Sequence, residues 1–199
     1  MNCVSFFGSI GVGKTTLGQK VAEVLKSAVF IPEDLEENIH LDKFYANMKK
    51  WGFLSTLEML LLMANQFDKI PHSAQTVILD NGIAELICYA TFEHKSGILN
   101  DDEFYTYQRL YRKLLQLTPT IDLFVYLYCS EGIQLKRIAQ RGRPYEASIN
   151  RQFLAALNRE YMTWVDTLPQ DKLIRISTER KVDISRLAAD INQRLPKKV

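Results

Sequence analysis

The chain has 199 residues, of which 47% are hydrophobic and 24% are charged, and its formal net charge is +2. This composition is typical of a globular protein and excludes an intrinsically disordered chain. The small net charge gives no support for a protein that binds nucleic acid or a membrane surface.

Predicted strands and helices alternate along the chain. Short apolar runs predict five strands, at residues 3–7, 28–32, 76–80, 121–129 and 172–177. Apolar residues at helical spacing predict helices at residues 14–25, 38–48, 51–68, 83–94, 101–117, 131–141, 149–165 and 183–194. This alternation predicts an α/β fold, a five-stranded parallel sheet with helices on both faces. No linker-like segment divides the chain, so we expect one domain over residues 1–199 with a frayed tail at PKKV.

The cysteines and histidines carry no metal-binding pattern. Three of each are scattered along the chain, which argues against a His or Cys metal site and favours a reduced intracellular protein. No signal peptide is visible, and the apolar segment FLSTLEMLLLMANQF carries Glu58 and Asn65 and is too short to span a bilayer. We therefore expect a cytoplasmic protein.

The segment FFGSIGVGKTTLG, residues 6–18, contains the P-loop pattern G-x-x-x-x-G-K-[ST]. In a P-loop, backbone N–H groups surround the phosphates, the lysine contacts the β and γ oxygens, and the Ser or Thr hydroxyl ligates Mg²⁺. The required context, a strand before the loop and a helix after it, is predicted here. The residues expected to bind a nucleoside triphosphate are Gly8, Ser9, Ile10, Gly11, Val12, Gly13, Lys14, Thr15 and Thr16.

Glu33 follows the second predicted strand. The carboxyl ends of parallel strands meet at the edge where ligands bind, so this carboxylate is placed to accept a proton from a hydroxyl that attacks the γ-phosphoryl group. The alternative is an acidic loop or a helix cap, since Glu36 and Glu37 follow.

The segment RIAQRGRPYE, residues 137–146, concentrates three arginines. Arg137 and Arg141 are four residues apart and share a helix face, Gly142 ends the helix, and Arg143 follows. Guanidinium groups on a hinged segment can close over a triphosphate and neutralise its charge, which predicts a lid over about residues 137–148. The alternative is a solvated basic helix end.

In this order, the segments resemble those of the deoxynucleoside kinase family, most closely its bacterial deoxyadenosine/deoxyguanosine kinase branch. The resemblance covers nearly the whole chain. It is carried by GSIGVGKTT, PEDLEENIHLDKFYANMKKW, PTIDLFVYL, LKRIAQRGRPYE and FLAALNREYMTW. The P-loop and the lid occur in many small-molecule kinases, whereas LDKFY in this order is more specific.

On the acceptor side, the resemblance implies a (deoxy)nucleoside whose 5′-hydroxyl receives the γ-phosphate of ATP or another nucleoside triphosphate. Glu33 would be the general base for that hydroxyl. Tyr45 and Glu146 would hold the sugar 3′-hydroxyl.

On the donor side, the resemblance implies that Lys14, Arg141 and Arg143 surround the transferring phosphoryl group and that Arg137 stacks on the donor base. Thr15 and Asp80 would serve Mg²⁺, and Asp80 would do so directly or through water. The resemblance also implies a dimer, formed by the predicted helices 83–94 and 149–165, with a second copy or with a related kinase.

The acceptor side departs from the family pattern. Asn81-Gly82 stand where the family has Arg-Ser, and an amide cannot replace the guanidinium fork at a phosphate. Thr56 stands where the family has a glutamine that reads the nucleobase, and its shorter side chain cannot make the two-point amide contact. Further departures are Asp34, where the family has Pro, and Leu86-Ile87, where many members have an Asp-Arg or Ala-Arg pair.

Three hypotheses follow. The first is a divergent deoxynucleoside kinase, favoured by retention of Glu33, Tyr45 and Glu146. The second is a catalytically degenerate subunit that binds nucleotide and regulates an active partner kinase. The third is a P-loop kinase that acts on a non-nucleoside hydroxyl. The Asn81-Gly82 change favours the second or the third.

Two further carboxylates, Glu58 and Glu85, lie near these departures and are candidates for contacting a different acceptor. Both fall on predicted helices. The favoured interpretation of each is a helix residue that faces the surface.

Overall fold

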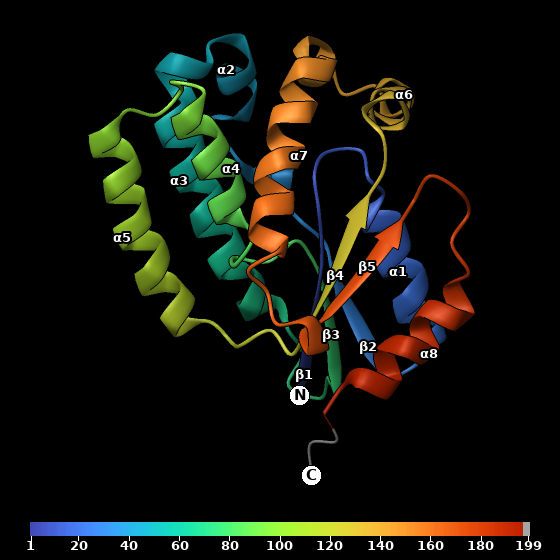
Figure 1. Ribbon diagram of the computed structural model, residues 1–199. Helices are drawn as coiled ribbons and strands as arrows, with labels where there is room; N and C mark the ends of the chain where they lie inside the picture. Colours follow the sequence, from blue (N-terminus) through green and yellow to red (C-terminus); the bar gives the residue numbers. More distant parts are fainter. Residues whose placement is uncertain (197–199) are drawn as a thin grey trace.

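A single five-stranded sheet organises the computed structural model, which describes residues 1–196. The strands are ordered β2-β3-β1-β4-β5, and every neighbouring pair is parallel. Their bounds are β1 Asn2–Phe7, β2 Ala28–Ile31, β3 Thr76–Asp80, β4 Leu123–Tyr128 and β5 Leu173–Ser177. Because all strands run the same way, their carboxyl ends lie along one edge of the sheet, the upper edge in Figure 1.

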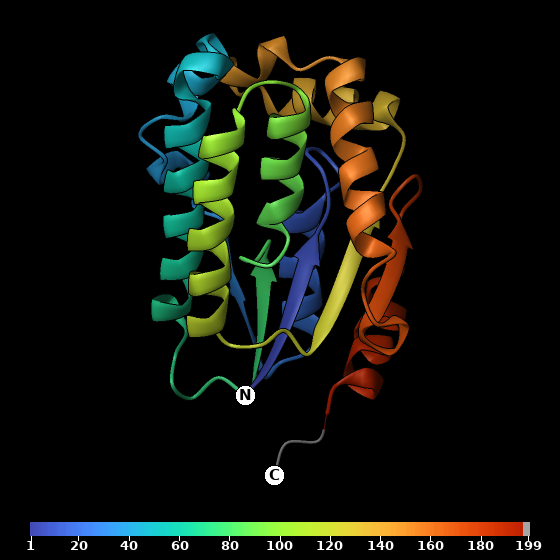
Figure 2. The same ribbon diagram turned by 60° about the vertical axis from the view of Figure 1, so that its left-hand side comes forward.

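Helices cover both faces of the sheet. Their bounds are α1 Lys14–Val24, α2 Leu41–Ala46, α3 Met48–Asn65, α4 Leu86–Lys95, α5 Asp101–Leu117, α6 Glu131–Arg141, α7 Arg151–Val165 and α8 Ile184–Arg194. Helices α1 and α8 pack on one face, and α4 and α7 pack on the other, with α3 and α5 beside α4 (Figures 1 and 2). Within residues 1–196, no helix has the length and apolar character needed to cross a membrane.

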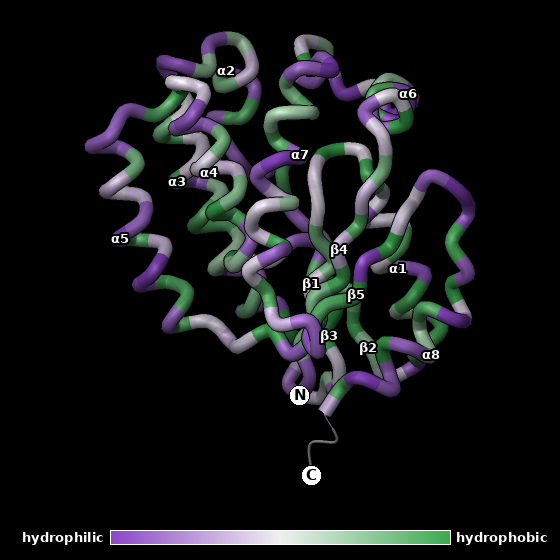
Figure 3. The backbone as a smooth tube through the Cα atoms, viewed as in Figure 1, coloured by the Kyte–Doolittle hydropathy of each residue, from purple (hydrophilic) through white to green (hydrophobic). Residues whose placement is uncertain are grey.

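The central strands are apolar on both faces because helices cover both. Successive side chains of a strand point to opposite faces, so Phe6 packs in the core beneath α1 and α8, and Phe7 packs in the core beneath α4 and α7. Figure 3 shows the result as a mostly apolar central sheet, surrounded by helices in which apolar and polar residues alternate. This rigid centre holds the carboxyl edge of the sheet, where the candidate site lies.

The predicted fold class is confirmed, and most predicted elements agree with the structure to within two or three residues. The predicted helix at 38–48 is one of the differences, because α2 begins only at Leu41. Asn38 explains this difference: its side chain accepts a hydrogen bond from the His40 N–H at 3.0 Å and donates to the Ser55 carbonyl at 3.0 Å. A side chain that bonds to nearby backbone in this way competes with helix formation.

Four short 3₁₀ segments fill the connections. They span Leu35–Glu37, Gln66–Lys69, Pro144–Ser148 and Gln170–Lys172. The predicted frayed tail, PKKV, falls almost entirely on residues 197–199, outside the described residues.

Candidate active site

The P-loop connects β1 to α1, and glycine sets its shape. Gly8, Gly11 and Gly13 have φ angles of 143°, 77° and 96°, a region that other residues rarely adopt. A Cβ atom on Gly8 would lie 2.3 Å from the carbonyl oxygen of Leu127, and one on Gly11 would lie 2.9 Å from that of Gln134. Only glycine therefore fits the loop, and the loop ends at the amino end of α1, a favourable position for a phosphate.

Lys14 brings a positive charge to this loop. Its Nζ donates to the carbonyl oxygens of Gly8 and Ser9, at 3.0 and 3.2 Å, so the side chain folds back along the P-loop. Burial raises the pKa values of the neighbouring carboxyl groups of Glu33 and Asp80, and the same ammonium group opposes that rise.

Thr15 and Asp80 meet at the base of the loop. The Thr15 hydroxyl donates a hydrogen bond to Asp80 Oδ2. Burial raises the pKa of Asp80, and Lys14 and the Thr15 hydrogen bond oppose that shift. A hydroxyl and a carboxylate are oxygen donors of the kind that Mg²⁺ uses together with substrate phosphates and water, so the two residues fit the predicted metal. Residues 1–196 contain no group of three or more His, Cys, Asp or Glu side chains able to hold a metal by themselves.

Arg137, on α6, ties the P-loop to the segment after β5. Its Nη1 donates to the carbonyl oxygens of Gly11 and Val12, each at 3.2 Å, and its Nη2 donates to that of Thr178 at 2.7 Å. These bonds anchor the guanidinium group beside the phosphate loop. Its stacking on a donor base stays a prediction.

Glu33 and Asn81 form a hydrogen-bonded pair at the ends of neighbouring strands, β2 and β3. The Asn81 amide donates to Glu33 Oε1 at 3.0 Å. Burial raises the pKa of Glu33 to about 7, although Lys14, the Asn81 hydrogen bond and Arg143 favour its ionised form. A carboxyl group with this pKa can exchange a proton near neutral pH, as a general base requires.

Asn81 is also where the backbone turns. Its φ is 58°, which asparagine tolerates better than most residues, and its N–H donates to the Phe6 carbonyl at 3.0 Å. Gly82, which the sequence places beside it, does not need a positive φ.

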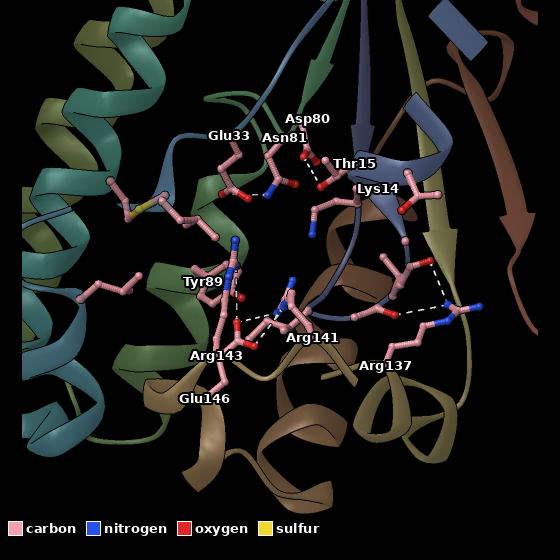
Figure 4. A pocket seen from close by; sticks show the side chains of 18 of the residues that line it. Lys14, Thr15, Glu33, Asp80, Asn81, Tyr89, Arg137, Arg141, Arg143 and Glu146 are labelled. Carbon is pink, nitrogen blue, oxygen red and sulfur yellow. Dashed lines mark hydrogen bonds and ion pairs between the residues drawn. The ribbon is translucent and has the colours of Figure 1, made fainter. Parts of the chain in front are cut away.

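The lid arginines converge on one buried carboxylate. Arg141 binds Glu146 through two hydrogen bonds, from Nε at 3.1 Å and from Nη2 at 2.5 Å. Arg143 Nη1 lies 3.7 Å from the same carboxylate. Gly142, between the two arginines, has a φ of 70° and ends α6 as the sequence predicts. Figure 4 shows this cluster across the cavity from Lys14, Glu33 and Asn81.

Tyr45, on α2, lies next to this cluster. Its ring stacks on that of Tyr145 with centroids 5.5 Å apart and an interplanar angle of 26°. Burial, together with the nearby charge of Glu146, raises the pKa of the Tyr45 hydroxyl, which is therefore neutral at physiological pH. The two residues predicted to hold a sugar hydroxyl are thus brought together.

Thr56, on α3, does not stand alone at its end of the cavity. Its hydroxyl donates a hydrogen bond to Glu93 Oε2, a side chain of α4 that is only 4% exposed. Burial raises the pKa of Glu93 to about 8, against the effect of the Thr56 hydrogen bond.

The expectation that Glu85 faces the surface is wrong. Its side chain is fully buried and accepts hydrogen bonds from the Ser5 hydroxyl and from the Gly82 N–H, the latter at 2.8 Å. Glu85 thus supports the turn that carries Asn81, and this turn delays the start of α4 to Leu86. Glu58 is partly exposed and does not line the cavity.

One cavity of about 720 Å³ joins these groups. It is lined by the P-loop, by Glu33, Asn81 and the lid, and by Thr56 and Glu93. The predicted site residues that line it are Ile10, Gly11, Val12, Gly13, Lys14, Thr15, Thr16, Glu33, Tyr45, Thr56, Asp80, Asn81, Arg137, Arg141, Arg143 and Glu146. Gly8 and Ser9 lie in the same loop and meet Lys14 through their carbonyl groups.

A family model described as deoxynucleoside kinase matches residues 4–198. The chain belongs to the deoxynucleoside kinase family. Its membership and its fold make it a kinase-like phosphotransferase, and they confirm the family predicted from the sequence.

Several proteins similar to this nucleoside kinase are named as kinases of particular deoxynucleosides. A deoxyadenosine kinase of Dictyostelium discoideum is 30% identical over 93% of this chain and 76% of its own length. A deoxyguanosine kinase of Bacillus subtilis is 29% identical over 97% of this chain and 99% of its own. A solved structure of deoxyadenosine kinase from M. mycoides with bound dCTP has the same fold, with a TM-score of 0.84, 22% identity, and coverage of 96% of this chain and 98% of that one.

Tyr89 and Glu93 are among the cavity residues that the sequence analysis did not identify. The signal was present, because Leu86, Tyr89 and Glu93 stand at i, i+3 and i+7 and so share one face of α4. Both Tyr89 and Glu93 project from that helix toward the end of the cavity that Thr56 lines.

Proposed function

We propose that the protein transfers the γ-phosphate of ATP, with Mg²⁺, to the 5′-hydroxyl of a deoxynucleoside. The observation that carries this proposal is a partly buried carboxyl group, Glu33, in the same cavity as the P-loop lysine and the lid arginines. A phosphate donor site and a base for a hydroxyl acceptor therefore adjoin.

In the proposed reaction, Glu33 accepts the proton of the 5′-hydroxyl as the oxygen attacks the γ-phosphorus. The bond from the γ-phosphorus to the β–γ bridging oxygen breaks, and ADP leaves. Its pKa of about 7 matches this task, since a base is most effective when its pKa is near the working pH. Asn81 holds Oε1 of the carboxyl group, which limits the directions in which Glu33 can accept the proton.

Lys14, Arg141 and Arg143 supply the positive charge that stabilises the transferring phosphoryl group. The last two must exchange part of their bonding to Glu146 for the phosphoryl oxygens as the lid closes. Mg²⁺, held through Thr15 and Asp80, would neutralise charge on the β- and γ-phosphates. Arg143 already acts electrostatically on Glu33, which supports a partial replacement for the arginine absent at position 81.

Two observations support a deoxynucleoside as the acceptor. Tyr45 and Glu146 offer a hydroxyl and a carboxylate to a sugar hydroxyl. The relatives are named as kinases of deoxyadenosine and deoxyguanosine. A homodimer or a pair with a related kinase, formed through α4 and α7, and a cytoplasmic location stay predictions.

The test is direct product analysis. The protein is incubated with MgATP and each of the four common deoxynucleosides, and 5′-monophosphates are measured by chromatography. We expect transfer to at least one of them. Glu33→Gln should lower kcat by about 10²–10⁴-fold, the range of general base catalysis. By calorimetry, that variant should bind an ATP analogue as the unchanged protein does.

Other outcomes would favour the other hypotheses. Binding of ATP with no transfer to any nucleoside would exclude the proposed reaction. A catalytically degenerate subunit or a kinase for a non-nucleoside hydroxyl would then replace it.

A further inference from the structure

The far end of the cavity, beyond Glu33 and Tyr45, has apolar and aromatic walls and one buried hydrogen-bonded pair between helices. Phe44 of α2, Met59 of α3, and Leu86 and Tyr89 of α4 line it. Flat apolar walls of this kind suit the faces of an aromatic ring system. A nucleobase also needs a polar partner at its edge.

The candidate partner is the Thr56–Glu93 pair. It joins α3 to α4 across this end of the cavity, and both side chains line the cavity although they are less than a tenth exposed. Ser55, the neighbouring hydroxyl that lines the cavity, already accepts a hydrogen bond from Asn38 at 3.2 Å. Oε2 of Glu93 is engaged by Thr56, so Oε1 is left for a ligand.

The charge of Glu93 decides which edge it can bind. No lysine or arginine within residues 1–196 forms an ion pair with it. The titratable groups that face it are the hydroxyls of Tyr45, Tyr89 and Tyr107. A tyrosine cannot carry a positive charge, and because burial raises the pKa of each hydroxyl, all three are neutral. Burial raises the pKa of Glu93 itself to about 8. A buried carboxyl group without a cation is neutral at pH 7.

We infer that Glu93, with Thr56, reads the Watson–Crick edge of the acceptor and selects a base with a ring-nitrogen acceptor beside an exocyclic amino group, namely adenine or cytosine. This inference rests on the proposed function. The acid proton on Oε1 is donated to N1 of adenine or N3 of cytosine, and the amino group donates to the Thr56–Glu93 oxygens. Guanine and thymine present an N–H at that ring position, which faces the acid proton unfavourably.

The proposed role of Glu93 also explains why a threonine can stand at position 56. Thr56 is too short for the two-point contact of the glutamine that the family places there, but it holds a carboxylic acid that has the same pattern of one donor and one acceptor. The two-point contact is thereby moved from α3 to α4.

The test is the ratio of kcat/KM for deoxyadenosine to that for deoxyguanosine, measured with MgATP from about pH 6 to about pH 8.5. The unchanged protein should favour deoxyadenosine by about tenfold or more at the lower pH, in the range of one good two-point base contact. The ratio should fall toward the higher pH as Glu93 ionises. Ionisation of Glu33 affects both substrates alike and cancels in the ratio.

Three variants and a control separate base reading from helix packing. Glu93→Gln should abolish the pH dependence of the ratio. Glu93→Leu should lower kcat/KM for deoxyadenosine by about tenfold or more, chiefly through KM, and so collapse the ratio. Thr56→Val should lower the ratio in the same direction. Glu58→Gln, on the same helix as Thr56 but outside the cavity, should leave the ratio unchanged.

Two kinds of result would overturn the role of Glu93 in base selection. A ratio that favours deoxyguanosine at about pH 6, or one that is unchanged in Glu93→Leu, overturns the inference while the proposed function stands. A purely structural role would lower the melting temperature and slow all nucleosides equally, which also overturns it. If Glu93→Leu does not fold, the pH dependence in the unchanged protein and its loss in Glu93→Gln decide. Failure of the unchanged protein to act on any nucleoside removes the proposed function and this inference together.

Discussion

The donor half and the acceptor half of the cavity are built in different ways. The donor half is a run of backbone, residues 8–16, whose shape depends on three glycines and whose charge comes from Lys14. The acceptor half is made of side chains from separate elements, such as Glu33 after β2, Asn81 after β3, Thr56 on α3 and Glu93 on α4. Backbone groups do not change when side chains do, so divergence concentrates in the acceptor half.

Electrostatics separate the two halves as well. Lys14 and Arg137 bring positive charge to the donor half, whereas the acceptor half holds the partly buried carboxyl group of Glu33 and the buried one of Glu93. Burial raises the pKa of Glu33 to about 7 and that of Glu93 to about 8. Positive groups that are already in position stabilise the charge of phosphates. Carboxyl groups whose pKa lies near 7 can exchange a proton and form hydrogen bonds with an uncharged acceptor. The lid, in which Arg141 forms an ion pair with Glu146, lines the cavity that the two halves share.

Removing the donor charge should have the largest effect. Lys14→Ala should reduce phosphoryl transfer by about 10³-fold or more and weaken ATP binding, because the ammonium group contacts the β- and γ-phosphates. The fold should survive, since the glycines set the loop. Calorimetry with an ATP analogue and a coupled kinase assay measure both effects, with Lys20→Ala, an exposed position on the same helix, as control. Unchanged binding of the analogue would show that the donor site is elsewhere.

Breaking the link between the halves should come next. Arg141→Ala or Arg143→Ala should lower kcat by about 10²–10³-fold, the cost of one charged transition-state contact, and raise the KM for ATP less. Steady-state kinetics measure both, and Arg112→Ala, at an exposed position of α5, is the control. If kcat is unchanged in both lid variants, these arginines form only a solvated helix end.

The acceptor half should impose the pH dependence. Glu33 acts as a base only when ionised, and its pKa is raised to about 7, so kcat/KM should rise with pH and level off above that value. Between about pH 7 and pH 5 the loss should be about 50-fold, since about half of the carboxyl group is ionised at its pKa and about one part in a hundred two pH units below it. A pH–rate profile measures this limb, and Glu33→Gln should lack it. Persistence of the limb in that variant would assign the base to another group.

Restoring the family residues should have the smallest effect, a gain. Asn81→Arg with Gly82→Ser should raise kcat/KM on a deoxynucleoside by about tenfold, because the guanidinium fork returns to the phosphate. A serine Cβ at Gly82 would lie 3.3 Å from Glu85 Oε2, a contact that a small shift relieves. The strain falls on position 81, where the φ of 58° costs an arginine about 1 kcal/mol, seen as a lower melting temperature.

Gly82→Ser alone is the control for that variant. If the double variant folds and gains nothing while the unchanged protein is also inactive on every deoxynucleoside, the acceptor is not a nucleoside, or there is none. The protein would then be a nucleotide-binding subunit or a kinase with a different acceptor.

Much of the fold could be predicted from the sequence because its signals are local. The helices at 101–117 and 131–141 and the strand at 76–80 have the bounds that apolar spacing and Gly142 indicate. Helix α2 was overestimated because Asn38 meets Ser55, a contact 17 residues away that no local pattern shows.

The donor half could be predicted from the sequence because its strand, glycine loop and helix are contiguous in the chain. In the acceptor half the sequence indicated single residues such as Glu33, but the burial and the partners of its side chains depend on how separate elements pack. Glu85 is a carboxylate on a predicted helix in the sequence, yet it is buried because α4 packs against the sheet and Ser5 lies beneath it. Glu93 acquires its raised pKa and its partner Thr56 in the same way, since burial and a contact across 37 residues arise only when α3 and α4 come together.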